Sequence, residues 1–162
     1  QMIQPIAKTA GNLVENMRDL IWVLNPGNNT LEILLSRIRE YANDYLEDLD
    51  IATEFHWPSP IPTIEISKEA HRHLIMVVKE AIQNATKHAN ASCIYFVATS
   101  SSTHIQLTIR DNGKGFVQDA SFNAGNGLRN MQQRMDQIGA QLHIDSNSEG
   151  TSIIITLMRT KS

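Results

Sequence analysis

Apolar residues recur at helical spacing through the first fifty residues and predict two helices. In the first, steps of four and three residues alternate, which is typical of a coiled-coil seam and equally of an amphipathic helix lying on its own domain. These apolar positions are Ile6, Ala10, Leu13, Met17, Leu20 and Leu24. Pro26 and Gly27 end this helix, and Thr30 is a suitable N-cap for the second. The second apolar stripe consists of Leu31, Leu34, Leu35, Ile38, Tyr41, Ala42, Tyr45, Leu46 and Leu49.

The remaining residues alternate between strand-like and helix-like patterns. Two more helices are expected, one from near Ser67 to Ala89 and one from Gly127 to Ile138, where Gly139 ends it. Strands are expected at residues 52–57, 93–98, 104–111, 141–145 and 151–158. This order predicts the α+β class, as a two-layer α/β sandwich. Its mixed, mostly antiparallel sheet would carry helices on one face, with the N-terminal helices ahead of it.

Composition indicates a soluble globular protein, because 41% of the 162 residues are hydrophobic and 19% are charged. A net charge of −3 and a pI near 6.1 argue against direct nucleic-acid binding. No apolar run is long enough to span a membrane, so we expect no membrane contact. The single cysteine, Cys93, excludes a disulfide framework, and its apolar strand indicates a small core residue. Because the chain begins with Gln1, we expect it to be a piece of a longer protein.

Four polar residues share one face of the helix that begins near Ser67. Glu80, Asn84, Lys87 and His88 are spaced so that their side chains stack along that face. For an average helix this pattern is a solvated surface. Here an alternative is open, because Asn84 offers a neutral oxygen suited to Mg²⁺ and Glu80 could accept a proton. Lys87 and His88 could offset phosphate charge. Two further histidines on this helix, His71 and His73, are expected to be surface or packing residues.

Two glycine-rich stretches make the nucleotide-site hypothesis stronger. Asp111 ends a strand in phase with its apolar residues, so the carboxylate points toward the core and requires a donor from the protein or from a ligand. Gly113 and Gly115 remove side chains beside it, which would let a flat ring approach the backbone. Gly125 and Gly127 stand at the start of a helix, where free N–H groups favour phosphate. The loop between the two stretches is longer than most connections, as functional lids often are.

Three motifs in this order resemble those of the GHKL ATPase superfamily. The closest resemblance is to sensor histidine kinases of the subfamily paired with LuxR/NarL-type response regulators. The segment from Glu80 to Ser92 resembles the N box, the segment from Asp111 to Phe116 the G1 box, and the segment from Gly125 to Arg134 the G2 box and its helix. Gly150 and Thr151 stand where that family has its last ATP-contacting turn. The resemblance covers residues 67–158 most strongly.

The resemblance implies a Bergerat fold that binds ATP with Mg²⁺. By position, Asp111 would hold the adenine amine, and Asn84 would bind the metal. Glu80 would be the general base or positioning residue, with Lys87 and His88 near the phosphates. The remaining cofactor-binding residues would be Gly113, Gly115, Gly125, Gly127, Leu128 and Thr151. Arg134 also matches the family pattern, but the sequence gives it no role.

The sequence therefore predicts the ATP-binding catalytic domain of a two-component sensor histidine kinase. None of the six histidines has the acidic context of a phosphoacceptor, so the phosphoacceptor helix is expected elsewhere in the same or a sister subunit. Residues 1–26 would end a dimerisation or linker helix, and residues 27–162 would form the catalytic domain. The expected partners are ATP and a response regulator with LuxR/NarL-type output. We expect the domain to lie in the cytoplasm and the full-length protein to form a homodimer. The sequence leaves open whether the full-length protein is anchored in the inner membrane.

Two alternatives are open from the sequence. One is another GHKL ATPase, such as an anti-sigma-factor-like Ser/Thr kinase or an ATP-hydrolysing machine of the gyrase and chaperone kind. Lys87 followed by His88 favours the histidine kinases over these. The other is a non-catalytic, nucleotide-gated dimerisation module. The presence of both Glu80 and Asn84 argues against such a loss of activity.

Overall fold

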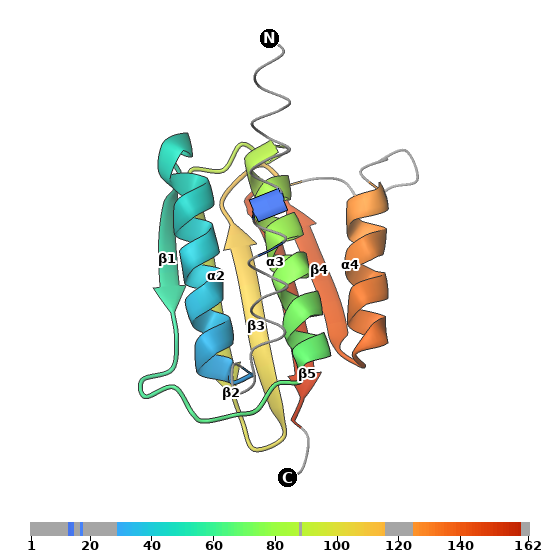
Figure 1. Ribbon diagram of the computed structural model, residues 1–162. Helices are drawn as coiled ribbons and strands as arrows, with labels where there is room; N and C mark the ends of the chain where they lie inside the picture. The colour runs from blue at the N-terminus through green and yellow to red at the C-terminus, as the bar shows by residue number, and fades with distance from the viewer. Residues whose placement is uncertain (1–12, 15–16, 18–28, 88, 116–124, 160–162) are drawn as a thin grey trace.

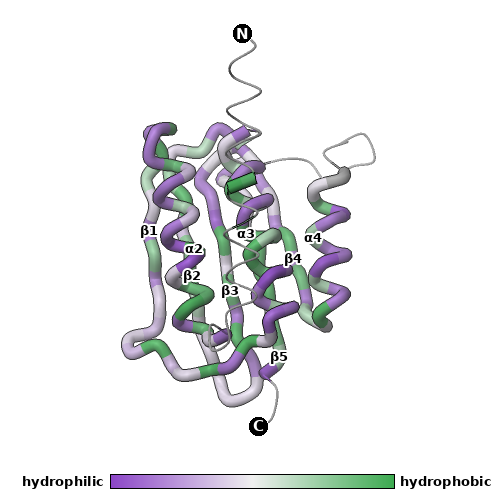
Figure 2. Tube along the Cα trace, viewed as in Figure 1, coloured by the Kyte–Doolittle hydropathy of each residue, from purple (hydrophilic) through white to green (hydrophobic). Residues whose placement is uncertain are grey.

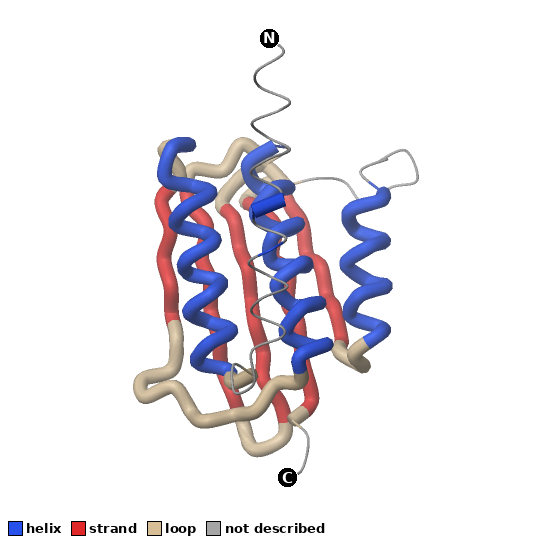
Figure 3. The backbone as a smooth tube through the Cα atoms, viewed as in Figure 1, coloured by secondary structure: helices blue, strands red, loops and turns tan. Residues whose placement is uncertain are grey.

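The computed structural model describes residues 13–14, 17, 29–87, 89–115 and 125–159. Its elements from residue 31 onward form one layer of helices over one sheet (Figures 1 and 3). The helices are α2 (Leu31–Leu46), α3 (Lys68–Lys87) and α4 (Gly125–Gln137), with a 3₁₀ turn at Glu47–Leu49. The strands are β1 (Ala52–His56), β2 (Cys93–Ser100), β3 (His104–Asp111), β4 (Gln141–Asn147) and β5 (Gly150–Met158).

The sheet has the mixed, mostly antiparallel character that the sequence predicts. Its strand order is β1-β2-β3-β5-β4, with β1 parallel to β2 and all other neighbours antiparallel. The helices lie on one face, with α3 between α2 and α4 (Figure 1). Because β3 is the central strand and ends at Asp111, that carboxylate lies at an end of the sheet, close to where α3 also ends.

The core lies between the helices and the inner face of the sheet. In β2 and β3 buried and less buried residues alternate, as expected for strands with one covered face. Figure 2 shows hydrophobic and polar residues mixed along each element, which amphipathic packing requires. The largest fully buried side chains are Phe96, Leu31, Leu35, Ile38, Leu46, Ile82, Ile94, Met131, Met135, Ile155, His71 and Val77.

Local capping signals fix the ends of the helices. The Thr30 hydroxyl accepts a hydrogen bond from the N–H of Ile33 at 3.4 Å, and the Ser67 hydroxyl accepts one from Ala70 at 3.0 Å. Gly139 has a φ of +69°, and the N–H beyond it returns to the carbonyl of Met135 at 2.9 Å. This left-handed termination confirms the predicted end of α4. The helix begins two residues earlier than expected, at Gly125.

Two expectations about the core are wrong. Leu49, predicted to extend the stripe of α2, is 47% exposed, because the helix gives way to a 3₁₀ turn that ends at left-handed Asp50. Cys93 is only partly buried, because β2 turns its even-numbered residues inward. Its Sγ instead lies 3.9 Å from the Glu54 carboxylate on the outer face of the sheet.

The predicted N-terminal helix lies mostly outside the described residues. Leu13, Val14 and Met17 are helical there, and each is more than half exposed. No helix within the described ranges has the length and hydrophobicity that crossing a bilayer requires.

Candidate nucleotide site

The C-terminal half of α3 presents the predicted polar face. Glu80 and Asn84 are half-buried, and Lys87 is exposed in the last turn. The opposite stripe of the helix is buried in the core, so these polar side chains point away from the core. His88 lies outside the described residues. Within those residues, no cluster of three His, Cys, Asp or Glu side chains could hold a metal ion by itself.

The Asp111 carboxylate is the most specific feature at this end of the sheet. Its side chain is 7% exposed, and Oδ1 accepts hydrogen bonds from the N–H of Gly113 at 2.9 Å and of Thr151 at 3.3 Å. Burial raises the pKa of this carboxyl, and the two backbone donors oppose the rise. Among the described residues no hydrogen bond reaches Oδ2. The protein therefore satisfies one oxygen and leaves the other for a further donor.

The glycines after Asp111 have a structural reason within the protein. A Cβ at Gly113 would collide with the carbonyl oxygen and Cβ of Ala89. Gly115 has a φ of +70°, and a Cβ there would collide with the carbonyl oxygen of Asn147. The G1-like turn is thus packed between the loop that follows α3 and the β4–β5 hairpin.

Asn112 is an anchor that the sequence interpretation did not single out. Its Oδ1 accepts hydrogen bonds from the N–H groups of Ser92 at 2.9 Å and Cys93 at 3.0 Å. Its Nδ2 donates to the Ser92 hydroxyl at 2.9 Å. These bonds tie the end of β3 to the start of β2 beside Asp111. An asparagine directly after a strand is a local signal for such bonding to nearby backbone.

The β4–β5 hairpin supports the other side of Asp111. Thr151 is buried, and its hydroxyl and that of Ser146 are 2.8 Å apart. Gly150 has a φ of +141°, and a Cβ there would collide with the carbonyl oxygen of Asp111. The structure therefore brings together Asp111, Gly113 and Thr151, which the sequence assigned to one adenine end.

The first turn of α4 lies against Glu80. A Cβ at Gly127 would collide with the Oε1 atom of Glu80 in its present position, so a larger residue there would require the end of the Glu80 side chain to move. Leu128 is half-buried, and it packs against the core. Since α4 begins at Gly125, the N–H groups of its first turn have no acceptors within the helix. The Glu80 carboxylate and the backbone N–H groups of this first turn thus lie at one place.

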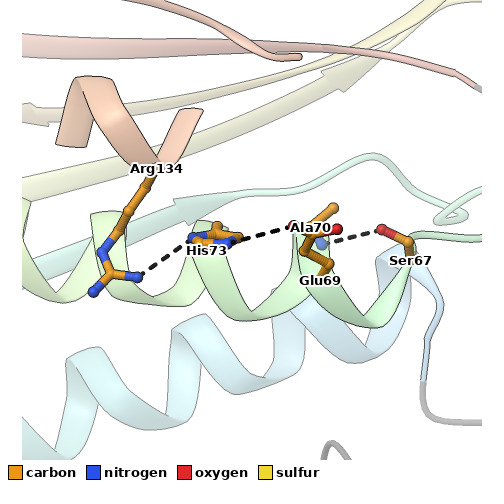
Figure 4. A network of polar contacts seen from close by, with 5 residues as sticks. All are labelled: Ser67, Glu69, Ala70, His73 and Arg134. Carbon is orange, nitrogen blue, oxygen red and sulfur yellow. Dashed lines mark hydrogen bonds and ion pairs between the residues drawn. The ribbon is translucent and has the colours of Figure 1, made fainter. Parts of the chain in front are cut away.

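Two histidines of α3 face its neighbouring helices. Arg37 of α2 lies 3.2 Å from His71 Nε2, and Arg134 of α4 lies 3.4 Å from His73 Nδ1 (Figure 4 shows the second contact). Burial, and next the charge of Arg37, lower the pKa of His71 to about 3. Burial also lowers the pKa of His73. Both are packing residues, with exposures of 0% and 3%, and the surface alternative is excluded.

The chain matches one family model and several sensor proteins. Residues 69–161 match the family described as histidine kinase-, DNA gyrase B-, and HSP90-like ATPase. Sensor protein VraS of Staphylococcus epidermidis is 30% identical over 146 residues, which are 90% of this chain and 41% of that protein. Sensor protein VraS of Staphylococcus aureus gives the same identity and coverage. The chain thus spans about two fifths of the length of these relatives.

Solved structures confirm the fold at low sequence identity. The histidine kinase domain of the Erythrobacter litoralis EL346 blue-light activated histidine kinase aligns with a TM-score of 0.70 at 20% identity, covering 96% of this chain and 83% of that one. Acinetobacter baumannii histidine kinase AdeS aligns with a TM-score of 0.67 at 18% identity, covering 96% and 81%. The predicted two-layer architecture is that of histidine kinase catalytic domains.

Proposed function

Because the chain belongs to the histidine kinase-, DNA gyrase B-, and HSP90-like ATPase family, we propose that it is the ATP-binding catalytic domain of a two-component sensor histidine kinase. In this proposal the domain positions Mg-ATP for phosphoryl transfer to a histidine outside the chain. The relatives named sensor proteins support the assignment to a sensor kinase. The match to an ATPase family supports the binding of ATP.

The observation that carries the proposal is the arrangement at Asp111. Two backbone donors hold Oδ1, so the carboxylate has one orientation and Oδ2 is available to a ligand. The exocyclic amine of adenine is a neutral donor of the right kind. Its hydrogen bond to Oδ2 would stabilise the charged carboxylate and lower the pKa that burial raises. A buried acceptor of this kind discriminates strongly against a base without that donor.

The polar face of α3 suits the phosphate end of the nucleotide. Asn84 would hold Mg²⁺ through its amide oxygen, together with phosphate oxygens and water, and the ion would neutralise charge that develops during transfer. Glu80 would orient or deprotonate the attacking group. The exposed Lys87, and His88, which is next in the sequence, would offset phosphate charge. The N–H groups of the first turn of α4, which have no acceptors within the helix, would receive phosphate oxygens.

We propose that the phosphoacceptor histidine lies outside this chain. His71 and His73 are too buried to meet a γ-phosphate, with exposures of 0% and 3%. His56, His104 and His143 lie on strands and lack an acidic neighbour of the acceptor type. We therefore propose an acceptor helix in the same or a sister subunit of a dimer. Onward transfer would go to a response regulator, for which LuxR/NarL-type output remains our proposal.

Calorimetric titration with a non-hydrolysable ATP analogue and Mg²⁺ tests this proposal. We expect wild-type protein to bind at micromolar strength and Asp111→Asn to lose at least about tenfold, because the amide donates where the carboxylate accepts. Asp145→Asn is the matched control, since Asp145 is exposed on β4 and its substitution makes the same charge change. Equal binding by wild type and Asp111→Asn would contradict the adenine anchor, and no binding by wild type would contradict the nucleotide site.

A further inference from the structure

One polar contact and one close approach join α3 to α4 at matched positions. Glu80 meets Gly127 near the start of α4, and His73 meets Arg134 near its end. On each helix the two contact residues are seven positions apart, or about 10 Å along the axis. The helices run in opposite directions, as Figure 1 also shows. The two contacts therefore define one register of α4 along α3.

The His73–Arg134 contact has only one chemically allowed form. A guanidinium has donors and no acceptor, so the Nδ1 atom of His73 must accept from Arg134 Nη1 across 3.4 Å. His73 is consequently neutral, with its proton on Nε2, which lies 3.9 Å from the Glu69 carboxylate (Figure 4). A protonated His73 would lose the acceptor and place a second positive charge beside Arg134.

Apolar packing alone gives α4 little axial specificity. Between Gly127 and Arg134, and in the turn just beyond, α4 buries Met131 and Met135, whose exposures are 1% and 0%. Methionine is flexible and tolerates shifted packing. A hydrogen bond, in contrast, is lost within a fraction of the 1.5 Å rise per residue of a helix. Among the described residues, the directional contact between α3 and α4 that resists sliding is therefore the one made by Arg134.

We propose that Arg134 is a positioning residue, whose hydrogen bond to neutral His73 sets the register of α4 and so seats Gly127 beside Glu80. The inference rests on the proposed function, in which the first turn of α4 receives phosphate and Glu80 lies at the reacting end. Arg134 touches neither nucleotide nor acceptor. It acts at a distance of two helical turns from Gly127, through the helix that both residues share.

The test compares nucleotide affinity with stability in variants of the whole chain. Affinity for a non-hydrolysable ATP analogue with Mg²⁺ and the thermal midpoint without nucleotide are measured for each. We expect Arg134→Ala to bind about tenfold more weakly. Arg134→Lys, which keeps a donor, recovers part of that loss. The matched control is Arg72→Ala, because exposed Arg72 adjoins His73 in sequence, carries the same charge and makes no described contact with α4.

A pH series separates positioning from simple packing. The charged groups around His73 are Glu69 and Arg72 on α3 and Arg134 on α4. We expect wild-type affinity to fall as the pH drops below the pKa of His73, which lies under its ordinary 6.5. His73→Gln offers an acceptor that does not titrate in this range. It should bind like wild type at neutral pH and lack the acid-dependent component.

Each outcome decides the inference. Weaker binding by Arg134→Ala, partial recovery in Arg134→Lys and a flatter pH profile in His73→Gln support it. Unchanged affinity in Arg134→Ala with only a lower thermal midpoint overturns it, as does an equal loss in Arg72→Ala. If Arg134→Ala does not fold, Arg134→Lys and His73→Gln still give the comparison. If wild-type protein binds nucleotide and Arg134→Ala binds it equally well, the positioning role of Arg134 is refuted and the proposed function is not. Wild-type protein that does not bind refutes the proposed function and this inference together.

Discussion

At the scale of single residues, the site depends on close backbone approach. Gly113 lies against Ala89, Gly150 against the carbonyl of Asp111, and Gly127 against Glu80. The sequence predicted glycines near a ligand, but for most of them the structure shows a neighbour within the protein. Such neighbours are distant in sequence, so spacing alone could not reveal them. The parity of β3, in contrast, is local, and it was enough to predict the buried Asp111.

A pair of glycine substitutions tests this point. Gly139→Ala should cost about 1 kcal/mol of unfolding free energy, because its φ is +69° but no atom lies near the added Cβ. Gly113→Ala should cost more, about 3 kcal/mol, because the Cβ meets backbone of Ala89 that is fixed by the Lys114 N–H. Urea unfolding measures both. Equal costs would contradict the packing of the G1-like turn.

At the scale of elements, α3 is the helix on which the others are placed. Its buried histidines point to opposite sides, His71 toward Arg37 of α2 and His73 toward Arg134 of α4. Helix ends were predictable because Thr30, Ser67 and Gly139 act on nearby backbone. The partners of Arg37 and Arg134 were not predictable, because they lie 34 and 61 residues away in sequence. The sequence left Arg134 without a role for this reason.

The contact between α2 and α3 predicts a pH dependence of stability. The pKa of His71 is about 3 in the folded protein and near 6.5 when unfolded, so the unfolded chain binds the extra proton between these values. The contribution of neutral His71 to the free energy of unfolding is fully present above about pH 6.5, and it decreases as the pH falls toward 3. We expect a loss of about 1 to 2 kcal/mol between about pH 7 and 5 in urea unfolding.

The control for this pH dependence is a pair of glutamine variants. His71→Gln should remove most of the decrease between neutral and acidic pH, because glutamine does not titrate there. His143→Gln should leave the decrease unchanged, because His143 is exposed on β4. A wild-type stability that is flat over this interval would contradict a buried neutral His71.

At the scale of the whole molecule, the topology brings distant motifs to one end of the sandwich. In the sheet β3 lies between β2 and β5. This order places Asp111, at the end of β3, beside Thr151 of β5, although the two residues are 40 apart in the sequence. The order of strands and helices predicted this class of fold, since amphipathic helices after half-buried strands leave few other packings. The sequence could not show how α4 is seated on α3, which requires the tertiary contacts of Glu80 and His73.

The most direct measurement of the central claim compares two nucleotides that differ at one group. Inosine triphosphate has an oxygen where ATP has the exocyclic amine that Asp111 is proposed to bind. With Mg²⁺ present, we predict that non-hydrolysable ATP binds wild-type protein at least about a hundredfold more tightly than the inosine analogue, because the buried Oδ2 would face another acceptor. Asp111→Asn should shrink this ratio. Equal affinity of wild type for both nucleotides would contradict the account.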